Sequence, residues 1–194
     1  MAKIVWTMGI SLDGYIEGPD HDISWHRVDE ELHQHMNDTI GQLGGLLSGR
    51  RTYEGMASYW PTADADPEAS AITVEFAGIW RDIPKAVYSR TIEHAGWNTT
   101  VYRDVVPEEV RALKERAGAD LWLGGAEIAE EFLRLGLVDA YRVYVHPALV
   151  GHGTRLFPEA DIAASLRLAE SRVFGNGVVL LHYEPETAED QPRR

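Results

Sequence analysis

The sequence predicts a single α/β domain, in which crossover helices connect the strands of one sheet. Short apolar runs typical of strands alternate along the chain with segments of helical periodicity. In two places, residues 47–54 and 121–133, an apolar run ends in a glycine-containing turn that leads into a helix. The length of 194 residues corresponds to about 1.3 domains at roughly 150 residues per domain, which favours one domain.

The first half of the chain predicts a strand, a helix, a second strand and a second helix. Residues 4–10 form a strand that ends in a loop marked by glycine and proline. Apolar residues recur at helical spacing over residues 29–42, so a helix with one apolar face is expected there. Residues 44–48 read as a buried strand, followed by a turn into a helix. Residues 60–78, rich in proline and aspartate, predict a loop with at most a short helix.

The second half continues the alternation. Strands are expected at residues 85–89, 99–102, 121–123, 140–146 and 178–183, and helices at residues 107–116 and 126–135. Pro107 suits the first turn of its helix. From Pro185 the sequence is polar and aperiodic, so residues 185–194 are predicted to be a flexible tail on a domain of residues 1–184.

Composition excludes several classes of function. The chain has 18 basic and 31 acidic residues, a formal charge of −13, so nucleic acid is not expected as a partner. It has no cysteine, which excludes disulfides, thiolate nucleophiles and thiolate metal sites. No apolar run approaches the ~18 residues of a membrane span. With no signal-peptide pattern at the N-terminus, the sequence predicts a cytoplasmic protein without a membrane partner.

A group of potential metal ligands lies close together in the sequence. No two of its histidines have the i, i+4 spacing of a helical zinc motif, and HExxH is absent, so no metal site is predicted. These side chains read instead as exposed loop and helix residues. The group consists of His21, Asp22, His26, His33 and His35.

The two glycine-containing turns are candidate anion sites, because a helix start offers free N–H groups and a positive dipole end. Arg50 and Arg51 adjoin one turn, and Arg90 follows the strand at residues 85–89. In a parallel sheet these segments leave the carboxyl ends of strands, where α/β sheets bind ligands. They suggest a ligand with several phosphates, such as a dinucleotide. The alternative is that the glycines only make tight turns and the arginines are solvated. The Rossmann and Walker motifs are absent.

Five motifs in order give the chain a family resemblance: SLDGYIEG (11–18), GRRTYE (49–54), YSRT (88–91), LGGAEIAEEFL (123–133) and HPALVGHGTRLF (146–157). Over residues 3–184 the sequence resembles the dihydrofolate reductase superfamily, in the branch of the C-terminal reductase domain of bacterial riboflavin-biosynthesis proteins. The resemblance implies a three-layer α/β fold. Its sheet would be mixed, mostly parallel and of about eight strands, with helices on both faces and NADPH across the carboxyl edge.

The resemblance also assigns residues to NADPH by position. They are Gly49, Arg50, Arg51 and Thr52 at the adenosine-side phosphates, Ser89, Arg90 and Thr91 around the 2′-phosphate, Gly124, Gly125, Ala126, Glu127 and Ile128 under the pyrophosphate, and Ile16 beside the nicotinamide, near the Gly9 backbone. Arg50 and Arg90 could pair with the extra phosphate, which would favour NADPH over NADH.

The resemblance implies a catalytic carboxylate near the start of the first long helix. Trp25 matches the tryptophan that precedes it, and Glu30 has the matching separation, with Asp29 as its neighbour. Asp29 has an alternative role as the helix N-cap. Asp13, in the loop expected to cover the active site, is a third candidate, and its alternative is a turn-forming Asp-Gly.

The implied function is an NADPH-dependent reductase that transfers a hydride to a small heterocyclic, pterin- or pyrimidine-like substrate. The alternative is a non-catalytic nucleotide-binding or regulatory module that retains the NADPH cleft. The resemblance also suggests a homodimer, with residues 143–150 as candidates for the contact.

Overall fold

The structure is a computed structural model that describes residues 1–157 and 163–186. Its strands are β1 (Ile4–Ser11), β2 (Tyr15–Glu17), β3 (Gly45–Gly49), β4 (Lys85–Tyr88), β5 (Thr99–Tyr102), β6 (Leu121–Gly124), β7 (Ala140–His146), β8 (Thr154–Arg155), β9 (Leu166–Val173) and β10 (Val179–Pro185). Its α-helices are α1 (Glu30–Ile40), α2 (Arg50–Ala57), α3 (Ala71–Asp82), α4 (Pro107–Arg116) and α5 (Ala126–Arg134). Two 3₁₀ helices, η1 (Pro19–His21) and η2 (Trp60–Ala65), lie in the loops.

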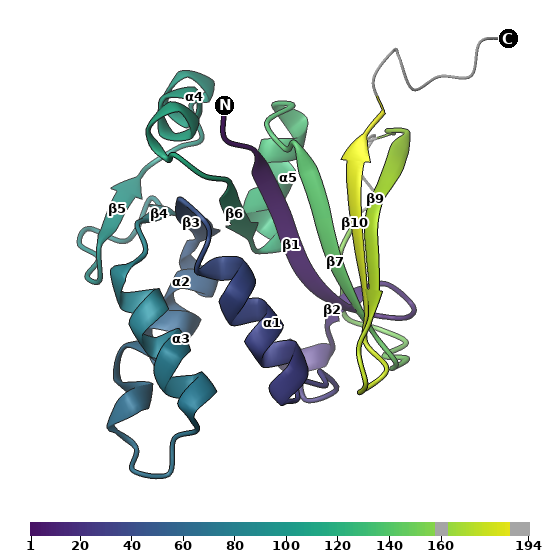
Figure 1. The fold of residues 1–194 in the computed structure, drawn as a ribbon. Coiled ribbons are helices and arrows are strands. Elements are labelled where there is room, and N and C mark those ends of the chain that lie inside the picture. The colour runs from purple at the N-terminus through teal and green to yellow at the C-terminus, as the bar shows by residue number, and fades with distance from the viewer. Residues whose placement is uncertain (158–162, 187–194) are drawn as a thin grey trace, which may run out of the picture.

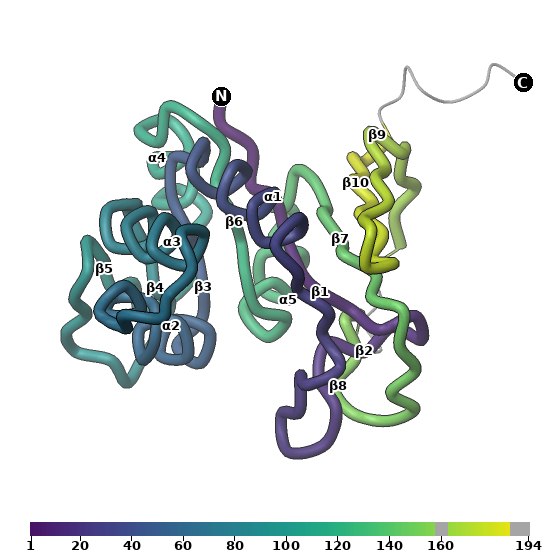
Figure 2. The backbone as a smooth tube through the Cα atoms, turned by 60° about the horizontal axis from the view of Figure 1, so that its bottom comes forward, coloured from purple at the N-terminus to yellow at the C-terminus, as the bar shows by residue number. Residues whose placement is uncertain are grey.

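Eight of the strands form one sheet in the order β5-β4-β3-β6-β1-β7-β10-β9 (Figure 1). The six strands β5, β4, β3, β6, β1 and β7 run parallel to one another, whereas β10 is antiparallel to both β7 and β9. The mixed, mostly parallel sheet is therefore confirmed. A separate pair, β2 and β8, lies beside the ends of β1 and β7 (Figure 2).

Helices cover both faces of the sheet, because side chains that alternate along a buried strand serve two cores. In β3, Leu46 packs into a core with Phe76 and Trp80 of α3, while Leu47 packs into the other core with Phe132 of α5. Figure 1 shows α1 in front of the sheet and α5 behind it. The predicted three-layer arrangement is confirmed.

The helices begin in two different ways. Asp29 caps α1 by accepting a hydrogen bond from the Leu32 N–H at 3.0 Å, which confirms its alternative role, and Ser70 caps α3 in the same manner. By contrast, α2 and α5 begin at Gly49 and Gly125, which supply no side-chain cap. The first N–H groups of α2 and α5 therefore lack the side-chain acceptor that α1 and α3 have.

The structure corrects the prediction in two segments. The expected loop at residues 60–78 is wrong from Ala71 onward, where α3 begins and carries Phe76 and Trp80 into the core. The strand β9 was not predicted. It lies at one edge of the sheet, next to β10, and is almost entirely exposed, so its sequence lacks the apolar pattern of a buried strand.

The predicted tail begins later than expected. Pro185 is the last residue of β10, and the Glu186 N–H donates to the Ser165 carbonyl at 2.9 Å. The rest of the predicted tail, residues 187–194, lies outside the described residues. Within the described ranges, no helix has both the length and the apolar character needed to cross a bilayer.

Candidate active site

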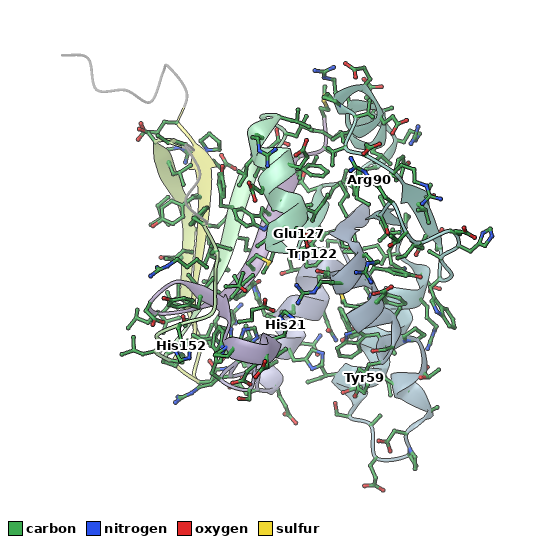
Figure 3. The ribbon with its side chains drawn as sticks, turned by 180° about the vertical axis from the view of Figure 1, so that it is seen from behind. His21, Tyr59, Arg90, Trp122, Glu127 and His152 are labelled. Atoms are coloured by element: carbon green, nitrogen blue, oxygen red, sulfur yellow. The ribbon has the colours of Figure 1, made fainter. Side chains whose placement is uncertain are left out.

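The carboxyl ends of the parallel strands border a cleft of about 910 Å³. The residues predicted to hold a cofactor that line it are Ile16, Gly49, Arg50, Arg51, Thr52, Ser89, Arg90, Thr91, Ala126, Glu127 and Ile128. In Figure 3 Arg90, after β4, lies toward one end, His21 of η1 lies toward the other, and Glu127 of α5 lies between them. Segments distant in sequence are thus brought together as the parallel sheet predicts.

Gly124 and Gly125 are not among the lining residues, and their surroundings explain why both are glycine. A Cβ at Gly124 would lie 1.7 Å from the Trp122 ring, so the indole fills that space. Gly125 has a φ of +95°, and its Cβ would lie 2.8 Å from the Thr52 hydroxyl oxygen. Gly125 therefore allows the starts of α5 and α2 to approach each other closely.

Charge in the cleft is balanced rather than positive. The basic side chains of the lining are Arg50, Arg51, Arg90 and Arg103, and the acidic ones are Glu17, Asp104, Glu127 and Glu131. Recognition of an anionic ligand would therefore depend on individually placed donors and not on net charge.

Arg50 and Arg90 are exposed and paired with acidic neighbours. Arg50 forms an ion pair with Glu54 at 3.1 Å, and both side chains are about half exposed. Arg90 donates from Nε to Asp104 at 2.9 Å, and 81% of its side chain is exposed. Exposed pairs of this kind are weak, so both arginines are free to turn toward a bound phosphate. Arg103 donates to the Ser89 carbonyl at 3.3 Å and thereby holds the segment that carries Arg90.

Arg51 connects α2 to the segment that follows β2. Its guanidinium lies 2.7 Å from His21 Nδ1 and 3.7 Å from the Glu17 carboxylate. Glu17 also accepts from the Thr154 hydroxyl at 2.8 Å and lies 2.9 Å from His21 Nδ1. Burial opposes the charge on Glu17, but the hydrogen bonds from Thr154 and His21 outweigh it and hold its pKa below the ordinary value. Glu17, His21, Arg51 and Thr154 form one polar network.

One side of β1 is open where the cleft begins. β1 pairs with β6 only over Ile4–Trp6, whereas its pairing with β7 continues as far as Ser11. Met8 and Gly9 lie in the part without a strand on the β6 side, and both line the cleft. A strand edge of this kind can offer backbone hydrogen bonds to a ligand.

Two stacked histidines lie against Gly9. The rings of His26 and His146 are 4.6 Å apart and inclined by 5°, and His146 Nδ1 accepts from the Arg27 N–H at 3.0 Å. A Cβ at Gly9 would lie 3.1 Å from His26 Cε1 and 3.2 Å from His146 Nε2. Burial lowers the pKa of His26, and burial together with the neighbouring His26 lowers the pKa of His146 to about 4. Both rings are therefore neutral at neutral pH.

These two histidines were missed from the sequence. The interpretation of His26 as an exposed histidine is wrong, because it is partly buried and lines the cleft. His146 is the last residue of β7, a parallel strand. It does not line the cleft, but its place at the carboxyl end of a parallel strand, where α/β sheets bind ligands, could have drawn attention to it.

The structure does not bring the three predicted carboxylates to the cleft. Asp29 caps α1, and Glu30 is the exposed first residue of that helix. Asp13 accepts from the Ser11 hydroxyl at 2.6 Å and from the Gly151 N–H at 2.7 Å. The Ser11 hydrogen bond, with help from backbone N–H groups, lowers the pKa of Asp13 to about 2. Asp13 thus ties the β1–β2 turn to the loop after β7.

Metal ligands do not gather anywhere in residues 1–157 and 163–186: no three histidine, aspartate or glutamate side chains there are placed to hold an ion. Of the histidines considered as ligands, His33 packs on Trp60 and Phe76, and His35 packs on Phe174.

The model of the family described as the RibD C-terminal domain matches residues 2–180. The chain belongs to this family. Two proteins of Bacillus subtilis (strain 168) are similar to it over almost their whole length. YyaP is 31% identical over 182 residues, covering 93% of this chain and 94% of YyaP. YwjB is 26% identical over 183 residues, covering 93% of this chain and 97% of YwjB.

Solved structures share the fold of this RibD C-terminal domain. A candidate riboflavin biosynthesis protein of Shewanella sp. PV-4 superposes with a TM-score of 0.72 at 22% identity, over 96% of this chain and 100% of that one. The diaminohydroxyphosphoribosylaminopyrimidine deaminase/5-amino-6-(5-phosphoribosylamino)uracil reductase of Thermotoga maritima gives a TM-score of 0.64 at 15% identity, over 95% of this chain and 56% of that one.

Proposed function

We propose that the protein is an NADPH-dependent reductase that transfers a hydride to a small heterocyclic, pterin- or pyrimidine-like substrate. The observation that carries the proposal is the meeting of two uncapped helix starts, α2 and α5, with exposed arginines in one cleft. Membership in the RibD C-terminal domain family supports a reductase. The name of the Thermotoga maritima protein includes a 5-amino-6-(5-phosphoribosylamino)uracil reductase, which supports a substrate that carries a pyrimidine ring.

The lining fits a dinucleotide with a 2′-phosphate. The N–H groups at the starts of α2 and α5 suit the bridging phosphates, with Arg50 and Arg51 beside them. Arg90 suits the 2′-phosphate because its side chain is exposed. Its ion pair with Asp104 is also exposed, so the pair is weak and Arg90 can exchange it for a phosphate. The open edge of β1 and Ile16 suit the nicotinamide end. When bound, NADPH would supply the hydride, and the residues of the chain would bind and orient it.

The alternative, a nucleotide-binding module without catalysis, is favoured by one observation: the predicted carboxylates Asp13, Asp29 and Glu30 do not line the cleft. The two functions differ in turnover and not in cofactor binding. Titration of the purified protein with NADPH, followed by cofactor fluorescence, tests what they share. Oxidation of NADPH at 340 nm with a panel of pterins and pyrimidines then separates them.

Arg90→Ala tests the placement of the cofactor. We expect it to weaken NADPH binding far more than NADH binding, because NADH lacks the 2′-phosphate. Arg111→Ala is the matched control, since Arg111 pairs with Glu108 on α4 and does not line the cleft. Equal losses for both cofactors would refute the 2′-phosphate assignment. Failure of the wild-type protein to bind NADPH would refute both functions.

A further inference from the structure

We propose that His26 binds the reducible group of the substrate, with its ring Nδ1–H donating a hydrogen bond to the heteroatom of an uncharged C=N or C=O. We assign His146 as a positioning residue that holds the His26 ring in place. The inference rests on the proposed function and specifies which side chain of this cleft meets the acceptor.

The location of His26 is the first argument. It lines the cleft together with Gly9 and Ile16, at the open edge of β1. The absence of a side chain at Gly9 lets the ring lie against the strand, because a Cβ there would approach His26 Cε1 to 3.1 Å. His26 is therefore next to the place where the nicotinamide end of the cofactor is proposed to bind.

The hydrogen bonding of His26 is the second argument. In the described part of the chain its ring makes no hydrogen bond, and Nε2 is shielded from solvent. With Nε2 shielded, Nδ1 is the ring nitrogen left to meet a ligand, and we assign it the donor role. The other polar side chains at this end, Glu17, His21 and Thr154, bind one another and Arg51. A ring nitrogen without a partner gains most from a ligand that supplies one.

The rigidity of the ring is the third argument. His146 stacks on one face of His26. The Trp25 ring packs nearly perpendicular to the His26 ring, with the two ring centres 4.2 Å apart. The Arg27 N–H bonded to His146 Nδ1 fixes that ring and places its proton on Nε2. Since Arg27 follows His26 directly, the same contact anchors the backbone that carries His26. A donor held in this way binds a ligand with little loss of side-chain entropy.

The charge state selects the kind of ligand. Burial lowers the pKa of His26, so a neutral ring meets the ligand. A neutral donor suits an uncharged carbonyl or imine and would not compensate a buried carboxylate. Pterins and pyrimidinediones carry such groups in a ring, and this shared chemistry is what His26 would recognise.

Histidine NMR tests the inference directly on the full-length protein. The histidine side chains are isotope-labelled, and the His26 signals are identified by their absence from the spectrum of His26→Phe. These signals are then followed while 5,6-diaminouracil or pterin is added to the NADP⁺-saturated protein. We expect the His26 signals to shift in the wild-type protein with at least one probe. If neither probe moves them, the inference is overturned, whether or not NADP⁺ binds.

Variants provide the second measurement, with probe affinity read from the change in the intrinsic tryptophan fluorescence of the protein. His26→Phe keeps the stacked ring and should weaken the probe by about three- to tenfold, with NADPH affinity unchanged. His26→Gln, which retains a side-chain N–H, should recover part of the loss. The matched control is His33→Phe, a partly buried histidine outside the cleft, which should bind as the wild type does. Unchanged probe affinity in His26→Phe would overturn the inference while leaving the proposed function intact.

His146→Phe tests the positioning role. It preserves stacking but cannot accept from the Arg27 N–H, so we expect a higher KM for the substrate with little change in the KM for NADPH. His146→Gln, which can still accept that hydrogen bond, should restore part of the substrate KM. An equal effect on both KM values would indicate a general structural role and refute the assignment of His146.

Discussion

Gly125→Ala should lower stability by an amount that follows from the local geometry. Gly125 has φ +95° and ψ 132° at the start of α5, a backbone conformation that residues other than glycine rarely adopt. Holding an alanine there costs about 1–3 kcal/mol. The new Cβ would also lie 2.8 Å from the Thr52 hydroxyl oxygen. For a domain of this size each kcal/mol lowers the Tm by about 2–4 °C, so a decrease of roughly 2–12 °C is expected.

Thermal unfolding followed by circular dichroism measures this decrease. The matched control is Gly78→Ala, because Gly78 lies inside α3 with nothing within 4 Å of a new Cβ. That change should raise stability by about 0.5–1 kcal/mol. The double variant Thr52→Ala/Gly125→Ala removes the close contact and retains the backbone strain. The decrease in Tm from Thr52→Ala to the double variant should therefore be smaller than the decrease from the wild type to Gly125→Ala. A Tm of Gly125→Ala equal to that of the wild type would refute the reasoning.

Three further predictions concern the carboxylates and the stacked histidines. Asp29→Ala should lower the free energy of unfolding by about 1 kcal/mol through loss of the α1 cap, while Glu30→Gln should leave it nearly unchanged. Denaturant titration measures both variants, and equal losses of stability would contradict the capping role of Asp29. Asp104→Asn should increase the affinity for NADPH relative to that for NADH, because it removes the negative charge that competes for Arg90. Fluorescence titration with both cofactors measures the two affinities, and an unchanged ratio between them would count against the prediction. The pKa of His146 is about 4 in the folded protein against an ordinary value of 6.5, so as the pH falls the unfolded state binds the proton first. The free energy of unfolding should therefore decrease from about pH 6.5 toward pH 4, and His146→Phe should flatten this decrease; a variant with the same slope as the wild type would disprove it.

The part of the cleft at the starts of α2 and α5 was predictable because its signals are local. Each of β3 and β6 is a short apolar run that ends in glycine and leads directly into a helix. Once the strands are parallel, geometry alone places their carboxyl ends at one edge. The same logic placed Arg90 after β4. Binding of NADPH at these residues, a homodimer and a cytoplasmic location all stay predictions.

The part of the cleft around His26 was harder to predict because its residues meet only through tertiary structure. His26 lies in a loop without periodicity, and nothing in its neighbourhood indicates that it stacks on a residue at the end of β7. Glu30 and its neighbour Asp29 were assigned by sequence separation from Trp25, and Asp13 by its place in a loop. Neither criterion reports where a side chain points. α3 was missed because the proline- and aspartate-rich stretch before Ser70 concealed the start of its apolar pattern, which Phe76 and Trp80 continue.

The position of β1 near the middle of the sheet has a consequence for biosynthesis. β1 is the first strand to leave the ribosome, yet its partners β6 and β7 lie within residues 121–146 and are synthesised much later. At ~5–20 residues per second, the first strand waits roughly 7–27 seconds for both neighbours. During that interval its apolar residues lack the strands that cover them in the folded protein and are open to aggregation. Because Gly9 meets His146 only when β7 pairs with β1, the nascent chain brings the two stacked histidines against β1 in the same event that covers the apolar residues of that strand.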